Sequence, residues 1–198
     1  CMPIYHQGRK VKEVYHQGRK VKEIWHMGRL IYTSRPVEVM PPTPGYSDAR
    51  NWLRATLQKY GLDYTTVTEL PFDIDSRNAT RMAYMFQDCS SLTSVPELDT
   101  SRVTEMYYMF RGCSSLTSVP EMDTGQVTNM CYMFNQCSSL TTVPTLNTGN
   151  VTNFDYMFQY CRSLADGNVT LTVKRKGATT TSMIFGSGLT REPFLTIE

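Results

Sequence analysis

MFQDCSSLTSVPEL at residues 85–98 recurs almost letter for letter as MFRGCSSLTSVPEM at 109–122 and as MFNQCSSLTTVPTL at 133–146. A fourth copy, MFQYCRSL at 157–164, begins the same phrase, so that the cysteine of each copy stands 24 residues after the previous one. Self-similarity at a fixed period of this size is the signature of a solenoid, in which each repeat forms one coil.

Each repeat carries seven apolar positions, which are too few to offset the ordering of 24 residues in an isolated coil. Stacked coils share hydrogen bonds and a continuous core, so the array is the expected unit of folding. The seven positions are represented in one coil by Leu92, Val95, Leu98, Val103, Met106, Met109 and Phe110.

Two kinds of local structure are predicted within a coil. SSLTSVPEL, residues 90–98, is rich in Ser, Thr and Val and ends near a proline, which favours a short strand. Met106, Met109 and Phe110 follow at i, i+3 and i+4, the spacing of one helical face. We therefore expect strand, corner, short helix and return in every coil.

The phrase MFxxCSSLTSVPxLDTSxVTxMxxMF resembles the BspA-like leucine-rich repeat, a family of surface proteins from bacteria, protozoa and phages. The resemblance covers about half of the chain. It implies an α/β leucine-rich-repeat solenoid used for adhesion or recognition, without catalysis or a cofactor. The pattern departs at its ends, where one residue is added before Met82 and the phrase dissolves after Cys161.

A second repeat opens the chain, with IYHQGRKVKE at residues 4–13 and VYHQGRKVKE at 14–23. Gln17-Gly18 and Met27-Gly28 are candidate two-residue turns, so residues 1–35 are expected to form a small antiparallel β-meander. Such a meander is too small for its own core, and it resembles segments of bacteriophage tail and head-fibre proteins. We expect it to assemble, with a trimer as one arrangement, through Tyr5, Val11, Val14, Tyr15, Val21, Ile24, Trp25 and Ile31.

The charge of the chain is uneven. Residues 1–35 hold eight Lys and Arg against two Glu, giving 8 − 2 = +6, while the whole chain carries only +2. The interposed glutamates and the absence of a reading helix disfavour nucleic-acid binding. His6, His16 and His26 fall in this repeat, either as repeated surface residues or as a metal or pH-sensitive cluster.

The remaining segments give a domain plan. Residues 36–46 contain four prolines and are expected to form a stiff linker, with the solenoid and its caps over 47–198. YSDARNWLRATLQKYG predicts a helix over 47–61, covering the open end of coils at about 62–164. Residues 165–198 are expected to form a C-terminal cap.

Six cysteines do not define a disulfide scaffold, because four occupy one column of the repeat. That column is expected to be a buried ladder of reduced thiols, with disulfides between neighbouring coils as the alternative. Cys131 lies in another column and is expected to be exposed. Cys1 either carries a lipid anchor or precedes the true start at Met2.

No catalytic constellation is apparent, because histidine is confined to the N-terminal repeat and the coils lack a phosphate-binding glycine loop or a metal motif. The protein is therefore expected not to be an enzyme. Function should lie where the copies differ, around the short helical turn, or on the polar strand face. The predicted partner surface comprises Tyr107, Asp155, Tyr160, Arg77, Arg81, Arg102 and Glu105 at the turn, and Thr93, Glu97, Thr117 and Glu121 on the strand face.

Together these features predict a bacteriophage virion protein, a tail or head fibre or decoration protein. Residues 1–35 would hold it on virion proteins or on copies of itself, while the coils bind a glycan or protein of the host surface. The alternative is an adhesin on the surface of a bacterial cell. No apolar run is long enough to span a membrane.

Overall fold

The computed structural model of this protein describes residues 35–174 and 176–197, and six short strands by their backbone within residues 4–33. The chain divides into two compact units, Cys1–Val37 and Glu38–Glu198.

The described part of the first unit consists of three separate two-stranded antiparallel hairpins. The expected single meander is therefore wrong, although short antiparallel strands do form. Val14, Val21, both candidate turns and Cys1 lie outside the described residues; the other six predicted assembly residues lie in strands. The hairpins pair β1 (Ile4–His6) with β2 (Arg9–Val11), β3 (Tyr15–His16) with β4 (Arg19–Lys20), and β5 (Glu23–His26) with β6 (Arg29–Thr33).

The proline-rich segment expected as a linker packs on the coils instead. Strand β7 (Val37–Val39) pairs with β8 (Asp73–Asp75). Met40 and Thr43 are fully buried, and the Thr43 hydroxyl donates a hydrogen bond to the carbonyl oxygen of Arg81 at 2.6 Å. The prolines hold this segment extended, but composition alone does not reveal that the residues between them are buried.

The predicted helix is confirmed as α1 (Asp48–Lys59), with Ala49, Leu53 and Leu57 buried against the core. Ser47 precedes the helix without a side-chain capping bond. Arg50 donates a hydrogen bond to Oε1 of Gln87 at 2.9 Å, so α1 packs beside the first copy of the repeat. In the described part of the chain, no helix has the length and apolar character to cross a membrane.

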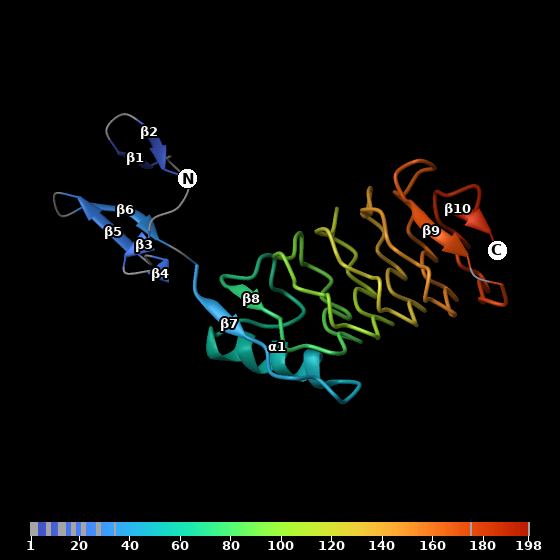
Figure 1. Ribbon diagram of the computed structural model, residues 1–198, viewed down its shortest axis with the longest axis horizontal. Coiled ribbons are helices and arrows are strands. Elements are labelled where there is room, and N and C mark those ends of the chain that lie inside the picture. Colours follow the sequence, from blue (N-terminus) through green and yellow to red (C-terminus); the bar gives the residue numbers. More distant parts are fainter. Residues whose placement is uncertain are drawn as a thin grey trace. The chain divides into compact units, whose positions relative to one another are not determined.

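Residues 64–189, here called the coil stack, wind through successive coils that lie side by side between β8 and β9 (Figure 1). Backbone bonds join each coil to the next: the N–H groups of Tyr84, Tyr108 and Tyr132 donate to carbonyl oxygens of the following coil at 2.9–3.2 Å. The N–H of Thr104 donates in the opposite direction, to the carbonyl oxygen of Thr80 at 2.9 Å. Each coil thus contacts its neighbours through a repeated set of backbone bonds.

The expected fold class, an α/β leucine-rich-repeat solenoid with a helical cap, is wrong. Among the described residues α1 is the only helix, and the copies of the repeat are built from turns and isolated bridges. The i, i+3, i+4 spacing is satisfied by a four-residue turn, in which Met109 N–H donates to the Met106 carbonyl at 3.2 Å.

A tyrosine in each copy prevents that turn from continuing as a helix. Tyr84, Tyr108, Tyr132 and Tyr156 have φ between 56° and 62°, in the left-handed region that ends a right-handed helix. Their N–H groups then point to the neighbouring coil. The expected strand also fails to form at residues 90–98, where a proline lacks the N–H that a ladder needs.

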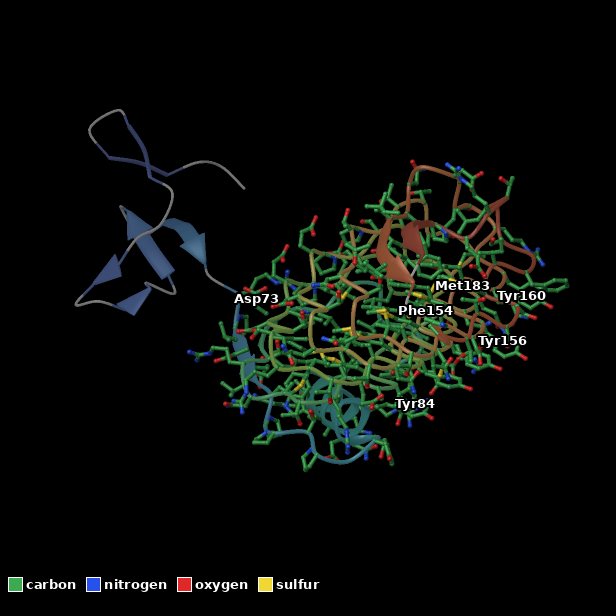
Figure 2. The ribbon with its side chains drawn as sticks, turned by 45° about the vertical axis from the view of Figure 1, so that its right-hand side comes forward. Asp73, Tyr84, Phe154, Tyr156, Tyr160 and Met183 are labelled. Carbon is green, nitrogen blue, oxygen red and sulfur yellow. The ribbon has the colours of Figure 1, made fainter. Side chains whose placement is uncertain are left out.

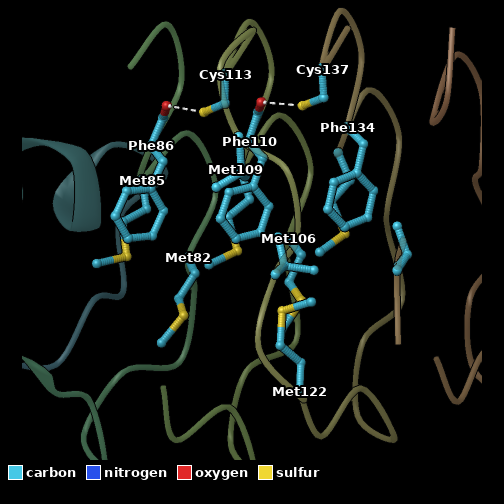
Figure 3. Close-up of a cluster of buried hydrophobic side chains, with 14 of the residues drawn as sticks. Met82, Met85, Phe86, Met106, Met109, Phe110, Cys113, Met122, Phe134 and Cys137 are labelled. Atoms are coloured by element: carbon cyan, nitrogen blue, oxygen red, sulfur yellow. Dashed lines mark hydrogen bonds between the residues drawn. The ribbon is translucent and has the colours of Figure 1, made fainter. Parts of the chain in front are cut away.

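The core of the coil stack consists of identical side chains placed above one another. The rings of Phe86, Phe110, Phe134 and Phe158 stack with centroids 5.4–5.6 Å apart and planes within 4° of parallel. Figure 3 shows the rings of Phe86, Phe110 and Phe134 beside core methionines and cysteines. Repetition of the sequence therefore gives a continuous core, in which Phe110 and Phe134 each lie between two other phenylalanine rings.

The cysteine column is buried, as predicted, and its thiols are free. The Sγ atoms of Cys113, Cys137 and Cys161 each donate to a phenylalanine carbonyl of the preceding coil at 2.9–3.0 Å, drawn for the first two in Figure 3. Each thiol thus packs in the core and also donates a hydrogen bond to a buried carbonyl oxygen of the neighbouring coil. Cys131 is half-buried rather than exposed.

The C-terminal segment continues the stack further than the sequence suggests. Phe158 N–H donates to Met183 O at 2.8 Å, and Met183 is buried, so residues 178–189 form another turn of the stack. Strand β9 (Leu171–Lys174) pairs in parallel with β10 (Phe194–Ile197). The phrase is lost after Cys161, but apolar residues persist at the core positions.

Candidate functional site

The structure brings three of the predicted partner-surface residues together. Arg81 and Glu105 are bridge partners in adjacent coils. The Tyr107 ring lies 5.2 Å from that of Tyr84 and 6.0 Å from that of Tyr46. The guanidinium of Arg81 lies over the Tyr46 ring at 5.0 Å. Tyr46 was placed in the linker by sequence reasoning, so its contribution to this cluster was missed.

Glu105 is the half-buried carboxylate of this cluster. Burial raises the pKa of its carboxyl, and Oε2 has no hydrogen-bond partner in the described structure. Oε1 accepts from the Thr128 hydroxyl at 3.4 Å. The cluster is an aromatic and charged surface, and nothing in its geometry supplies a nucleophile with an adjacent base.

Three other predicted residues have different surroundings. Arg77 pairs with Asp75 at 2.6 Å, and this contact lowers the pKa of the Asp75 carboxyl. Oδ1 of Asp155 accepts the Thr181 N–H at 2.6 Å, which ties two coils together. Arg102 is exposed. These side chains do not gather into one site with Arg81.

The four residues assigned to a strand face are exposed, but no sheet underlies them. Thr93 donates its hydroxyl to the Thr68 carbonyl at 3.0 Å, and Thr117 supplies a carbonyl to the Thr141 hydroxyl at 3.1 Å. Glu97 and Glu121 are also exposed. Threonine hydroxyls therefore join coils by donating to backbone carbonyls. The predicted sheet does not form at these residues, and their part in a partner surface stays a prediction.

The last predicted residue, Tyr160, lines a pocket of about 380 Å³ together with Ser114, Gln136, Ser138 and Arg162. These side chains come from three successive coils. Figure 2 shows Tyr160 toward the C-terminal end of the coils, far from Asp73 in the first coil. A volume of this size is within the range of small-ligand sites.

Tyr160 is held in place by the next coil. A Cβ at Gly186 would lie 2.6 Å from Cδ1 of Tyr160, so the ring lies directly on the Gly186 backbone. The Phe185 ring contacts it edge-on, with centroids 5.7 Å apart. The aromatic wall of the pocket is therefore fixed before any ligand binds.

Arg162 interrupts a column of serines. The hydroxyls of Ser90, Ser114 and Ser138 each donate to a backbone carbonyl of the preceding coil at 3.2–3.4 Å. At the fourth position Arg162 replaces serine, and Ser163 makes the corresponding bond to the Ser138 carbonyl at 2.7 Å. The Arg162 side chain therefore does not make the coil-to-coil hydrogen bond of this column. It is exposed and forms no ion pair with any described residue.

Of the five residues that line the pocket, Tyr160 is the one that belongs to the partner surface predicted from the sequence. Gln136 belongs to the same variable column as Tyr160, so the signal was present. Arg162 was also visible as the change from CSSL to CRSL. Ser114 and Ser138 repeat the common phrase and carry no such signal.

Among the described residues, no group of three or more His, Cys, Asp or Glu is placed to hold a metal ion. The side chains of His6, His16 and His26 lie outside the described part of the structure, so the histidine-cluster alternative stays a prediction.

The half-buried thiol of Cys131 offers a pH-dependent chemical probe of the folded coil stack. Burial raises its pKa to about 11, so the reactive thiolate is scarce at pH 7 and increases about tenfold per pH unit toward the pKa. We expect iodoacetamide to label Cys131 in the native protein at a rate that rises from pH 7 to 10, with Cys89, Cys113, Cys137 and Cys161 unlabelled until unfolding. Peptide mass spectrometry distinguishes the sites. Equal labelling of Cys137 and Cys131 in the folded chain would contradict the buried column.

The chain resembles a known protein family over its coil stack. The family described as "Mycoplasma protein of unknown function, DUF285" matches residues 73–191, more than half of the 198-residue chain. The chain belongs to this family. The DUF285 match begins at β8 and ends just after the last turn of the coil stack, so it excludes the hairpin unit and α1. No curated protein and no solved structure matches the chain.

Proposed function

We propose that this protein is a non-catalytic binding protein that is displayed on a surface and attaches to a target cell through its coil stack. The observation that carries the proposal is the polar pocket of Ser114, Gln136, Ser138, Tyr160 and Arg162. Three of its five lining residues stand where the repeat departs from its common phrase. Variation concentrated in a pocket, on a framework of repeated core residues, is typical of recognition on a rigid scaffold.

The arrangement of the site supports binding more than catalysis. Tyr160 is fixed by Gly186 and Phe185, while Arg162 extends from the stack without a described carboxylate partner. Preorganised side chains lose little entropy when a ligand binds. A pocket that is open to solvent gives modest affinity, which repeated display on a surface would strengthen through avidity.

The hairpin unit is proposed to attach the protein to copies of itself or to a larger assembly. The described strands of this unit pair only two by two, and two-stranded hairpins are marginally stable alone, so association with copies of the chain or with another assembly would stabilise them. The description of the family names Mycoplasma, which favours the surface of a bacterial cell. A virion protein is the second candidate, favoured by the separate hairpin unit at the N-terminal end.

The test uses fluorescently labelled full-length protein added to animal epithelial cells and to bacterial cells, read by flow cytometry. Saturable binding to animal cells, displaced by unlabelled protein, supports the cellular adhesin. Saturable binding to bacterial cells supports the virion protein. Absence of saturable binding to either cell type overturns the proposed function.

A chain lacking residues 1–35 separates the two units in the same assay. The deletion keeps β7 and the whole second unit, so we expect a folded protein whose mass by light scattering falls to that of a monomer. Its cell binding should weaken as avidity is lost, while the pocket stays intact. If the truncated chain assembles like the full-length one, the hairpins have no role in attachment.

A further inference from the structure

We infer that the pocket around Arg162 binds a saccharide whose pyranose ring carries one carboxylate. The inference rests on the proposed function, since it names the ligand class of the same site. It follows from the charge of the pocket, from the hydrogen-bonding capacity of its hydroxyls and from its aromatic wall.

The charge of the pocket selects a monoanion. Arg162 supplies one formal positive charge, and none of the other lining residues, Ser114, Gln136, Ser138 and Tyr160, is charged at neutral pH. Arg162 has no ion pair with any described residue to neutralise it. The planar guanidinium presents paired N–H donors that match the two oxygens of a carboxylate.

The hydroxyl groups favour a polyhydroxylated ligand. Ser114 and Ser138 already donate their protons to the Ser90 and Ser114 carbonyl oxygens, at 3.2 and 3.4 Å. Their oxygen lone pairs therefore remain available as acceptors for ligand hydroxyls. Gln136 adds both an amide donor and a carbonyl acceptor, so the pocket can bind ligand oxygens in either role.

The aromatic wall fits the apolar side of a sugar ring. Tyr160 rests on Gly186 and lies edge-on to Phe185, so its ring is packed at one side of the pocket, where a sugar ring could lie against it. The pocket volume of about 380 Å³ is enough for one or two sugar rings. A peptide with a free C-terminal carboxylate would share the anion, and its N–H groups could bond to the serine oxygens, but its backbone has no ring face to lie on Tyr160.

The substitution Arg162→Ser tests this inference, because it gives the fourth coil the serine that the other three copies carry. The probes are 3′-sialyllactose and a glucuronic-acid disaccharide, two sources of a ring carboxylate, with lactose as the neutral reference and 3′-sulfolactose as the sulfated one. Titration calorimetry on full-length protein should give binding of at least one carboxylated probe, weakened about tenfold or more by Arg162→Ser. Arg162→Lys, which keeps the charge without the planar fork, should be intermediate.

Arg102→Ser is the matched control, because it removes an exposed arginine that does not line the pocket. Its affinity for the carboxylated probe should stay within about twofold of the unsubstituted protein. Thermal melts of all variants establish that each is folded.

Several results would overturn the inference. Equal binding of lactose and sialyllactose, preference for 3′-sulfolactose, or equal effects of Arg162→Ser and Arg102→Ser would each do so. Cell attachment without carboxylated-saccharide binding overturns the inference and leaves the proposed function standing. Arginine-dependent saccharide binding without cell attachment supports the inference and overturns the proposed function.

Discussion

Replacing Phe110 with alanine is expected to lower the free energy of unfolding by about 3–5 kcal/mol. The Phe110 side chain is fully buried between Phe86 and Phe134, with ring centroids 5.4 and 5.5 Å away. Its removal leaves a gap in the middle of the column, and neither neighbouring ring can fill it because each is held by its own coil. Urea denaturation followed by circular dichroism measures the change.

Phe185→Ala is the matched control for this substitution. Phe185 is 59% exposed in the last turn of the stack, so the same loss of atoms creates no cavity. We expect a change below about 1 kcal/mol. If Phe110→Ala and Phe185→Ala destabilise the protein equally, the phenylalanine column does not form the packed core described above.

Gly188→Ala is expected to detach the last turn of the coil stack, at a cost of about 3 kcal/mol or more. A Cβ at Gly188 would lie 1.9 Å from the carbonyl oxygen of Leu164 and 3.0 Å from that of Arg162. Both obstacles are backbone atoms, which cannot turn aside as the end of a side chain can. The coil must therefore move away and break its hydrogen bonds to the preceding one.

Amide hydrogen exchange locates this effect. Phe154, Tyr156 and Phe158 donate their N–H groups to residues 179, 181 and 183, so their protection should be lost in Gly188→Ala. The N–H of Tyr108, which donates to Cys131 inside the stack, should stay protected.

Gly149→Ala provides the control, because its added Cβ would meet only Asn147 Oδ1 at an ordinary 3.5 Å. Exchange rates that are unchanged in both variants would mean that the last turn does not pack as described.

The sequence is sufficient to predict the stacking and the core, but not the local backbone. The spacing of Phe86, Phe110 and Phe134 depends only on the period, so their burial in one column follows from repetition. Helix and strand could not be predicted correctly, because apolar spacing at Met106 and Met109 fits a helical face and a tight turn equally well. The deciding residue is Tyr108, whose left-handed φ depends on hydrogen bonds to a neighbouring coil.

The pocket was only partly predictable for a related reason. Variation between copies identified Tyr160, and it also marked Gln136 and Arg162. Which variable residues share a pocket depends on how far each side chain reaches toward the next coil, as Tyr160 does over Gly186. Ser114 and Ser138 belong to the common phrase, so comparison of copies alone cannot assign them to a site.

The coil-to-coil hydrogen bonds have a mechanical consequence. Because the described backbone bonds of each coil go to the coils on either side of it, the interfaces of the stack can open separately. All interfaces bear the same tension when the two ends are pulled, but the outermost coil has a neighbour on one side alone and would peel first, releasing 24 residues, about 80 Å of extended chain. The stack would therefore lengthen in steps and absorb work at each one.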